Sequence, residues 1–467
     1  MTRMLLLSTV VICSMTSYIR EAHSLDELPT LSVDDAASDI EKDFIATPPF
    51  FAKLNNTPSQ CDTAPPTLNP PPLQPVYYTP DLVFNLGTTK IGFYGFIKAD
   101  YITETRITGN TTDVAPNTVP LDTDLADRHT QTLLDARSSR LGIKVEDTSN
   151  DVSMCGGLEF DFYTTSSDNI YGNAVSTNGR LCRLRLAYAL GETPSHFRFL
   201  VGQYSALPMQ DPEIPMPTRV NLIHYPVGAV DSRQPQFRLG YKHPLNDMAH
   251  LQYEVNAEAQ GYTIAPAYVT PEGGSTTQAS EQKWPLFNAK IAYLSQPFNL
   301  EVAGSVSRAY AITDVLGNRL DAAVWGIITN ASLHWKNLTL WGTLHHWVGL
   351  TGLTSGYFNQ MAIVNNQLLP AKANGGAIAL RWDFIKSKLW TDIMYGTERC
   401  NHISNSANFS GTNPKNMNDF RINLIGVLLK RWNIGIEYER NKVETFDENL
   451  GTDHIIHIGV WYAFGAS

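Results

Sequence analysis

The stretch from His454 to Phe464 constrains the fold of this chain more strongly than any other. In HIIHIGVWYAF, apolar side chains occupy every second position, at Ile456, Ile458, Val460, Tyr462 and Phe464. Successive side chains of a β-strand point to opposite faces, so this pattern predicts a strand with one continuous apolar face. A long apolar edge strand promotes aggregation. The strand therefore needs partners along both edges and surroundings that accept its apolar face.

The same alternation recurs along the chain from about Lys90. Sixteen segments alternate in this way: Lys90–Tyr101, Arg140–Glu146, Leu158–Phe162, Arg183–Leu190, Phe197–Val201, Phe237–Lys242, Leu251–Asn256, Asn288–Ser295, Leu300–Tyr310, Ala323–Trp335, Leu338–Val348, Gly375–Phe384, Leu389–Thr397, Phe420–Leu429, Asn433–Arg440 and His454–Phe464. Apart from the N-terminal stretch described below, no window is long and apolar enough for a membrane helix, which needs roughly 18 to 20 residues. The chain is therefore predicted to be an all-β protein.

The connections between these segments alternate in length. The short ones are Thr148–Asp151, Gly191–Ser195, His243–Asp247, Ser295–Asn299, Lys336–Asn337, Ile385–Ser387 and Lys430–Asn433. The long ones are Ile107–Gln131, Thr164–Asn178, Ser205–Gln234, Gly261–Trp284, Thr313–Asp321, Thr351–Lys372, Cys400–Asn418 and Val443–Asp453. Short turns on one rim and long loops on the other are typical of bacterial outer-membrane barrels. The fold is thus predicted to be a transmembrane antiparallel β-barrel of about 16 strands, over residues 87–467.

The predicted strand number determines what the interior contains. A barrel of about eight strands is filled by side chains, whereas one of sixteen to eighteen strands encloses an aqueous channel. Hydrophobic residues make up 43% of the chain and charged residues 17%. This average suits lipid-facing and water-facing positions that alternate. Because the inward positions are mostly charged or polar, the sequence predicts a pore, with outer-membrane lipid around it.

Three N-terminal segments precede the predicted barrel. Residues 1–24 resemble a secretory signal peptide, with Arg3, an apolar core and the sequence Ala22-His23-Ser24. Residues 25–54 form a predicted periplasmic extension, in which Ser32–Ile45 has helical spacing. That segment is either a short helix that needs partner copies or a disordered acidic segment. Residues 55–86 are rich in proline, which predicts an extended linker.

The third long connection, Ser205–Gln234, carries charged residues as well as prolines. The charged side chains include Asp211, Glu213 and Arg219. Proline restricts its own backbone and that of the preceding residue, which stiffens the loop. We expect this loop to fold into the lumen and narrow it; the alternative is an external surface loop.

A basic wall is predicted on neighbouring strands. Its members share the inward parity: Lys98, Arg140, Lys144, Arg183, Arg185, Arg198 and Arg238. Arginine in a partly desolvated cleft attracts carboxylates and can bind them bidentately. Glu159 and Asp161 supply opposite charge on the same wall. These bases either favour the passage of small anions or serve only as partners of the neighbouring carboxylates.

The cysteines show no metal or disulfide framework. After the signal, Cys61, Cys155, Cys182 and Cys400 remain, without CxxC spacing. Cys155 has lumen-facing parity and Cys182 lipid-facing parity, so these two are not expected to pair; a pairing of Cys61 with Cys400 is left open. The chain has no nucleophile-elbow, P-loop or HExxH motif, and its net charge is -10. We expect no enzyme activity, no metal, no cofactor and no nucleic-acid binding.

Four segments resemble the DcaP-like porins of Gram-negative bacteria. They are KIGFYGFIKADY (Lys90–Tyr101), DARSSRLGIKVE (Asp135–Glu146), GRLCRLRLAYALG (Gly179–Gly191) and FRFLVGQYS (Phe197–Ser205). The resemblance covers roughly Lys90 to Gln236. It implies a homotrimer of 16-stranded outer-membrane barrels, a periplasmic coiled-coil extension, and the uptake of small, often negatively charged solutes such as dicarboxylates.

Other functions are compatible with a barrel of this kind. A monomeric barrel could act as an adhesin or surface scaffold that binds partners through its long loops. An outer-membrane enzyme is a third possibility, with catalytic residues that meet across strands. The leading prediction is a diffusion channel for small hydrophilic solutes.

Overall fold

In the computed structural model, the described residues are 82–107, 118–147, 152–162, 182–211, 214, 216–222, 225–259, 279–281, 283–312, 319–350, 353–354, 361–364, 367–400, 413–429 and 431–465. The predicted signal, extension, helix and most of the linker lie outside these ranges, as do Cys61, Glu213 and the loop 164–178. Among the described residues, no helix is long and apolar enough to cross a membrane.

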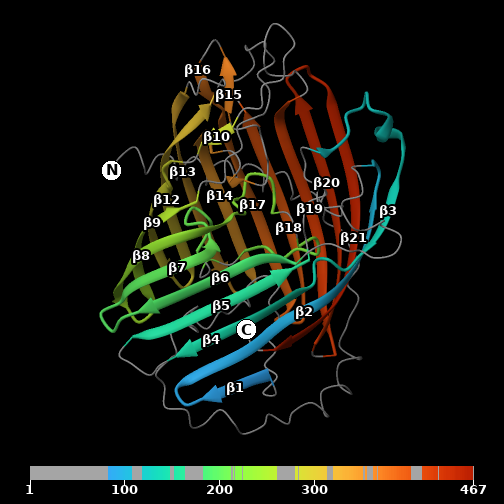
Figure 1. Ribbon diagram of the computed structural model, residues 1–467. Helices are drawn as coiled ribbons and strands as arrows, with labels where there is room; N and C mark the ends of the chain where they lie inside the picture. Colours follow the sequence, from blue (N-terminus) through green and yellow to red (C-terminus); the bar gives the residue numbers. More distant parts are fainter. Residues whose placement is uncertain are drawn as a thin grey trace. The chain divides into compact units, whose positions relative to one another are not determined.

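The described residues form strands and one short 3₁₀ helix (Figure 1). The elements are β1 Val83–Leu86, β2 Thr89–Glu104, η4 Leu125–Arg128, β3 Gln131–Asp135, β4 Arg140–Asp147, β5 Ser153–Asp161, β6 Arg183–Glu192, β7 Phe197–Ser205, β8 Arg233–Asn246, β9 Ala249–Glu258, β10 Ala279–Glu281, β11 Leu286–Ser295, β12 Phe298–Ile312, β13 Arg319–Trp335, β14 Leu338–Val348, β15 Met361–Val364, β16 Gln367–Pro370, β17 Lys372–Ile385, β18 Leu389–Cys400, β19 Pro414–Leu428, β20 Trp432–Thr445 and β21 Leu450–Gly465.

Sixteen of these strands form a closed antiparallel barrel, which confirms the predicted fold class. The barrel strands are β2, β4–β9, β11–β14 and β17–β21, and they match the sixteen predicted segments one to one. Each strand pairs with its neighbours in the chain. The ring closes where β21 pairs with β2, from Tyr94 opposite Gly465 to Glu104 opposite Ile455. The predicted partnership of the closing strand with the first strand is therefore confirmed.

Two short strands extend the pairing of β2. Strand β4 pairs with Thr89–Phe96 and β3 with Asp100–Glu104, so β3 and β4 act as one interrupted strand. On the other edge, β21 ends opposite Tyr94, and β1 begins with Val83 opposite Gly92. Strand β1 lies within the range predicted as linker. It continues the ladder along the part of β2 that β21 does not reach.

The alternation in the sequence determines which side chains face outward. On the closing strand, Ile456, Ile458 and Val460 are exposed on the outer face, whereas His457 and Trp461 are buried inside. Many large apolar side chains elsewhere are exposed on outward positions, among them Ile97 and Phe237. In water such a surface would be unfavourable, but an outward apolar band is what contact with lipid requires. The predicted faces of the closing strand are confirmed.

Two predicted long loops are shorter in the structure. The connection predicted over Val443–Asp453 is reduced to the residues between Thr445 and Leu450, because Glu444 pairs with Leu450 and Val443 with Gly451. Likewise β19 begins at Pro414, inside the connection predicted over Cys400–Asn418. Polar residues at these strand ends had suggested loops. They point into the barrel mouth instead, where Thr445 and Asp453 are buried.

Candidate functional site

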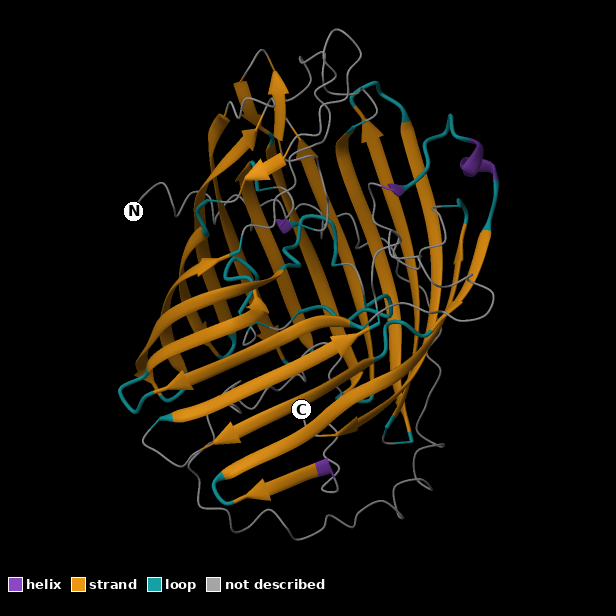
Figure 2. Ribbon diagram, viewed as in Figure 1, coloured by secondary structure: helices purple, strands orange, loops and turns teal. Residues whose placement is uncertain are grey.

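The candidate site is the barrel lumen, and its largest feature is the connection between β7 and β8. We call its described residues within 206–232 the lumen loop. Nearly all of them are buried, including Leu207, Val220 and Val227, which are fully enclosed. An external loop could not be buried in this way, so the predicted inward fold is confirmed. Figure 2 shows loop segments between the strands of the barrel wall.

Carboxylates on the barrel wall hold the backbone of the lumen loop. They accept hydrogen bonds from backbone amides: Glu258 from Leu207 (3.2 Å), Glu301 from Asp211 (3.0 Å), Glu437 from Val220 (2.9 Å) and Asn221 (3.2 Å), and Asp419 from Val227 (3.0 Å). An irregular loop leaves its amides without secondary-structure partners, and a buried unpaired amide is unfavourable. Inward acidic residues on β9, β12, β19 and β20 thus take the place of the backbone carbonyls that would accept these hydrogen bonds in a β-sheet.

Lys98 holds the middle of the loop. Its Nζ donates a 2.7 Å hydrogen bond to the carbonyl of Val220 and pairs with Asp100. Asp100 also accepts hydrogen bonds from Ser138 Oγ (2.6 Å) and contacts His457 Nε2 at 2.9 Å. Only 1% of Lys98 is exposed. Lys98 therefore lies beneath the loop and binds its backbone.

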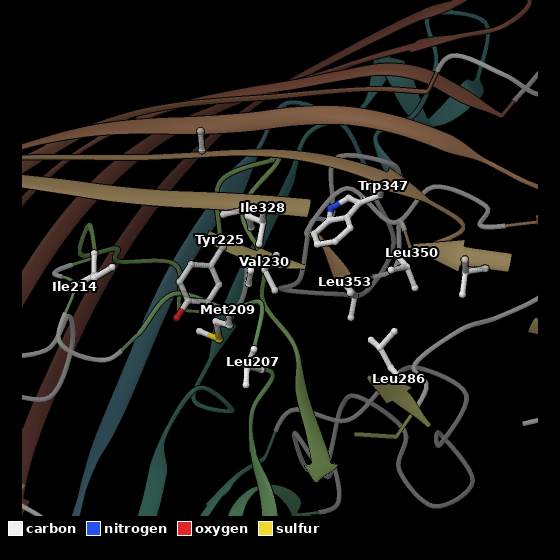
Figure 3. Close-up of a cluster of buried hydrophobic side chains, with 14 of the residues drawn as sticks. Leu207, Met209, Ile214, Tyr225, Val230, Leu286, Ile328, Trp347, Leu350 and Leu353 are labelled. Atoms are coloured by element: carbon white, nitrogen blue, oxygen red, sulfur yellow. The ribbon is translucent and has the colours of Figure 1, made fainter. Parts of the chain in front are cut away.

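Apolar side chains pack the loop against the β11–β18 side of the lumen. Figure 3 shows Leu207, Met209, Ile214, Tyr225 and Val230 of the loop beside Ile328 and Trp347 of the wall, with Leu286, Leu350 and Leu353 around them. Burial of such side chains removes apolar surface from water, which is the main stabilising contribution in a protein core. One side of the lumen is therefore a hydrophobic core rather than a wetted surface.

The two described charged residues predicted in the loop have different surroundings. Asp211 accepts from Gln252 Nε2 (2.8 Å) and lies 3.2 Å from Lys290 Nζ. Arg219 is 4% exposed and stacks its guanidinium 3.7 Å from the centroid of the Tyr225 ring, while its Nε and Nη1 have no hydrogen-bond partner. Burial lowers the pKa of Arg219. Arg219 is thus a buried cation that forms no ion pair with any described residue.

The remaining predicted bases form a network with carboxylates on β4–β9. Arg183 binds Asp161 through two hydrogen bonds of 2.8 and 2.6 Å. Arg185 bridges Glu159 (2.7 Å) and Asp161 (2.9 Å). The other contacts are Arg140 with Glu159 (4.0 Å), Lys144 with Glu146 (3.1 Å), Arg198 with Glu192 (3.5 Å), and Arg238 with Glu254 (3.6 Å). The bases are therefore not an isolated positive wall but members of ion pairs.

In these pairs the base is the more exposed partner. The Arg183 side chain is 41% exposed against 4% for Asp161. For Arg198 and Glu192 the values are 19% and 4%, and for Arg140 and Glu159 they are 14% and 4%. The guanidinium groups thus cover the carboxylates. The solvent-exposed part of these pairs is therefore mainly the basic side chain, although the pairs themselves are neutral.

Strand β6 contains a bulge that contradicts the predicted facing of three residues. Glu159 pairs with Leu186 but Phe160 pairs with Leu184, so Arg185 is the extra residue. A bulge shifts the alternation by one position. Leu186, Tyr188 and Leu190, predicted to face lipid, therefore turn inward. Tyr188 packs there against Tyr204, with ring centroids 4.6 Å apart.

Exposure divides the lumen into two parts. We call the inward faces of β4–β7 the open wall, because Arg140, Lys144, Arg183, Tyr188 and Tyr204 keep solvent exposure there. We call the inward faces of β9–β21, together with β2 from Phe96 to Glu104, the packed wall. Its inward residues in the middle of the strands are buried, for example Lys290, Asn330, Asp392 and Arg421. Figure 1 shows β4–β7 as one continuous sheet.

Several functional residues escaped the sequence analysis. They are buried acids and bases of the packed wall, which either contact the loop directly or pair with one another behind it: Asp100, Glu254, Glu258, Lys290, Glu301, Asp392, Asp419, Arg421, Glu437 and Glu439. All lie at inward positions of predicted strands, so parity could have identified them as lumen residues. Their partners could not be identified in this way, because they lie up to 217 residues apart in the chain.

In the described part of the chain, no group of three or more His, Cys, Asp or Glu side chains lies close enough to hold a metal ion. Cys155 is buried and Cys182 exposed, and both are free thiols, so the prediction that they do not pair is confirmed.

No protein-family model matches the chain, and no curated protein sequence matches it significantly. The outer membrane channel DcaP of Acinetobacter baumannii is similar in structure, with a TM-score of 0.64 at 18% sequence identity, over 83% of this chain and 99% of that chain. The anion-selective porin from Comamonas acidovorans has a TM-score of 0.50 at 11% identity, over 80% of this chain and 100% of that one.

These likenesses cover at least 80% of this chain and at least 99% of each solved channel. At such low identities they establish the fold and not the solute or the assembly. The predicted resemblance to DcaP is confirmed at this level: the chain has the fold of an outer-membrane channel.

Proposed function

We propose that the protein is an outer-membrane porin, a passive diffusion channel for small hydrophilic solutes. The single observation that carries this proposal is the unequal filling of the lumen. The lumen loop buries the packed wall, while the basic side chains of Arg140, Lys144 and Arg183 on the open wall keep partial solvent exposure. Solutes would therefore pass between the loop and β4–β7. The lipid-facing apolar band and the likeness to DcaP support the same location and role.

We infer a preference for small anions, including dicarboxylates, from the geometry of the ion pairs. The carboxylates of the open wall lie behind their guanidinium partners, which are the more exposed groups. Charge at a narrow, partly desolvated passage raises the local concentration of the opposite ion. The unpaired guanidinium of Arg219 adds positive charge from the loop side.

Three copies are proposed to assemble, as the sequence resemblance implies. Planar bilayers test both proposals with the full-length protein. Steady channels that close in three equal steps support a trimeric porin, and a reversal potential set mainly by chloride in a KCl gradient supports anion preference. Cation preference would contradict the anion proposal, and absence of conductance would contradict the porin itself.

A matched pair of variants locates the selectivity. Arg183→Gln removes the most exposed base of the open wall and is expected to reduce the chloride preference measurably. Arg308 is the control, because it forms a 2.7 Å pair with Asp321 on the outer face of β12. Arg308→Gln should leave the reversal potential unchanged; equal effects of the two variants would refute a role for the open wall.

A further inference from the structure

Two tyrosines of the open wall, Tyr188 and Tyr204, and Tyr94 of the adjoining strand β2 lie among arginines. Tyr94 contacts Glu159 through its hydroxyl at 3.2 Å, and Tyr188 and Tyr204 pack edge to face. The guanidinium of Arg238 lies 5.7 Å from the centroid of the Tyr204 ring. All three tyrosines keep partial exposure. We call Tyr94, Tyr188 and Tyr204 the tyrosine shelf.

Glycines make room for two of these rings. A Cβ added at Gly142 would lie 2.3 Å from the Tyr94 ring, and one added at Gly157 would lie 2.6 Å from the Tyr188 ring. The rings therefore lie down against the backbone of the neighbouring strand instead of standing across the lumen. A ring in this position leaves the passage open and turns aromatic surface toward it.

The register places the shelf between two groups of bases. In the strand register, Arg140 lies opposite Asp161, and Asp161 lies opposite Arg183, on the side toward the long loops. Two inward positions further along the strands, Lys144 lies opposite Gly157, and Gly157 lies opposite Tyr188 of the shelf. The second group of bases lies beyond the shelf: Arg238 is opposite Leu200, and Arg198 is opposite Glu192. Successive inward positions are about 7 Å apart along a strand. A flat ring on the shelf can thus place a carboxylate within reach of a guanidinium on either side.

We propose that the tyrosine shelf is a binding site for the ring of aromatic carboxylates, so that the channel favours these over aliphatic carboxylates of the same charge and size. The inference rests on the proposed passage of small anions and adds the class of solute. Aromatic pairs in offset or edge-to-face contact are more favourable than equal apolar area alone, and a guanidinium beside the ring strengthens the site.

The test compares benzoate with cyclohexanecarboxylate, which has the same charge and a similar size but no aromatic face. Single-channel current block is measured with the full-length protein in planar bilayers. We expect benzoate to block at about three- to tenfold lower concentration. Titration calorimetry of the detergent-solubilised protein with each solute gives the same comparison without a conducting channel.

Variants assign any difference to the shelf. In the Tyr188→Leu, Tyr204→Leu double variant, the two solutes should block equally. Gly157→Ala should weaken benzoate block alone, because the new methyl group displaces the Tyr188 ring. Tyr395→Leu is the control: this tyrosine faces outward and is 46% exposed, so the benzoate advantage should persist.

The outcomes separate this inference from the proposed function. Equal block by the two solutes in an anion-preferring wild-type channel would overturn the shelf and leave the porin standing. A benzoate advantage that survives the double variant would also overturn it. Absence of both conductance and calorimetric binding would overturn the inference together with the proposed function.

Discussion

The packed wall and the open wall are built from the same alternation but differ in what their inward residues contact. On the packed wall, Arg421 is fully buried between Asp419 (2.7 Å) and Glu439 (3.0 Å). On the open wall, Arg183 holds Asp161 and remains 41% exposed. The lumen loop causes the difference, because it excludes water from one side only. Inward polarity in a barrel sequence therefore predicts a lumen-facing residue but not whether that residue is wet.

The largest expected effect tests the buried ion pairs of the packed wall. Arg421→Met leaves Asp419 and Glu439 buried without their cation, and such losses cost about 3–5 kcal/mol. The free energy of unfolding in detergent, measured by urea titration, should fall by that amount. Arg308→Met removes an exposed pair and should cost less than about 1 kcal/mol. Similar losses in the two variants would show that burial on the packed wall does not raise the cost of breaking an ion pair.

The second prediction concerns the attachment of the loop. Glu437→Ala leaves the amides of Val220 and Asn221 unpaired, at about 1–3 kcal/mol for each buried group. We expect the loop to loosen, which should appear as increased noise and larger open-state current in single-channel records. Glu444→Ala on the same strand is the control, because Glu444 accepts its hydrogen bonds from Lys415 and Asn416 of the neighbouring strand β19. Quiet, unchanged records from Glu437→Ala would show that other contacts suffice.

A third, smaller effect is expected at the buried cation of the loop. Arg219→Met removes a charge that has no ion-pair partner among the described residues, so the free energy of unfolding should stay within about 1 kcal/mol of the wild type or rise. The same variant should show a weaker chloride preference in reversal-potential measurements. A stability loss as large as that of Arg421→Met would show that Arg219 has an important structural partner.

The smallest expected effect is the dependence of anion preference on ionic strength, because salt screens exposed charges more strongly than buried ones. Raising ionic strength from 0.1 to 1 M shortens the screening length from about 10 to about 3 Å. Anion preference that arises from the open wall should decline gradually over this range, while the free energy of unfolding, which depends on the packed wall, changes little. A preference that is insensitive to salt would place its origin among buried charges.

The sequence predicted most of the barrel and only part of the lumen. Strict alternation of apolar and polar residues identified all sixteen strands and the closing pair. The proline content and charged residues of Ser205–Gln234 suggested the inward fold of the loop. The bulge at Arg185 was missed, since LCRLRLAYALG alternates without interruption and the shift arises only from pairing with Glu159 and Phe160. The carboxylates that hold the loop were missed for a related reason: Glu437 meets Val220 through the closed barrel, and no local pattern records that contact.

Strands β21 and β1 lie along the same edge of β2 and run in the same direction, with only Phe93 of β2 between their pairing ranges. The end of β21 and the start of β1 are therefore almost adjacent, and a short covalent connection between them would make the backbone of the barrel continuous. A linker of one or two residues from Gly465 to Val83 would make this connection, and a new cut in a short turn, such as Lys336–Asn337, would leave every strand with its present neighbours. Circular permutants of this barrel should thus keep its topology, with the entry point of the chain moved around the rim.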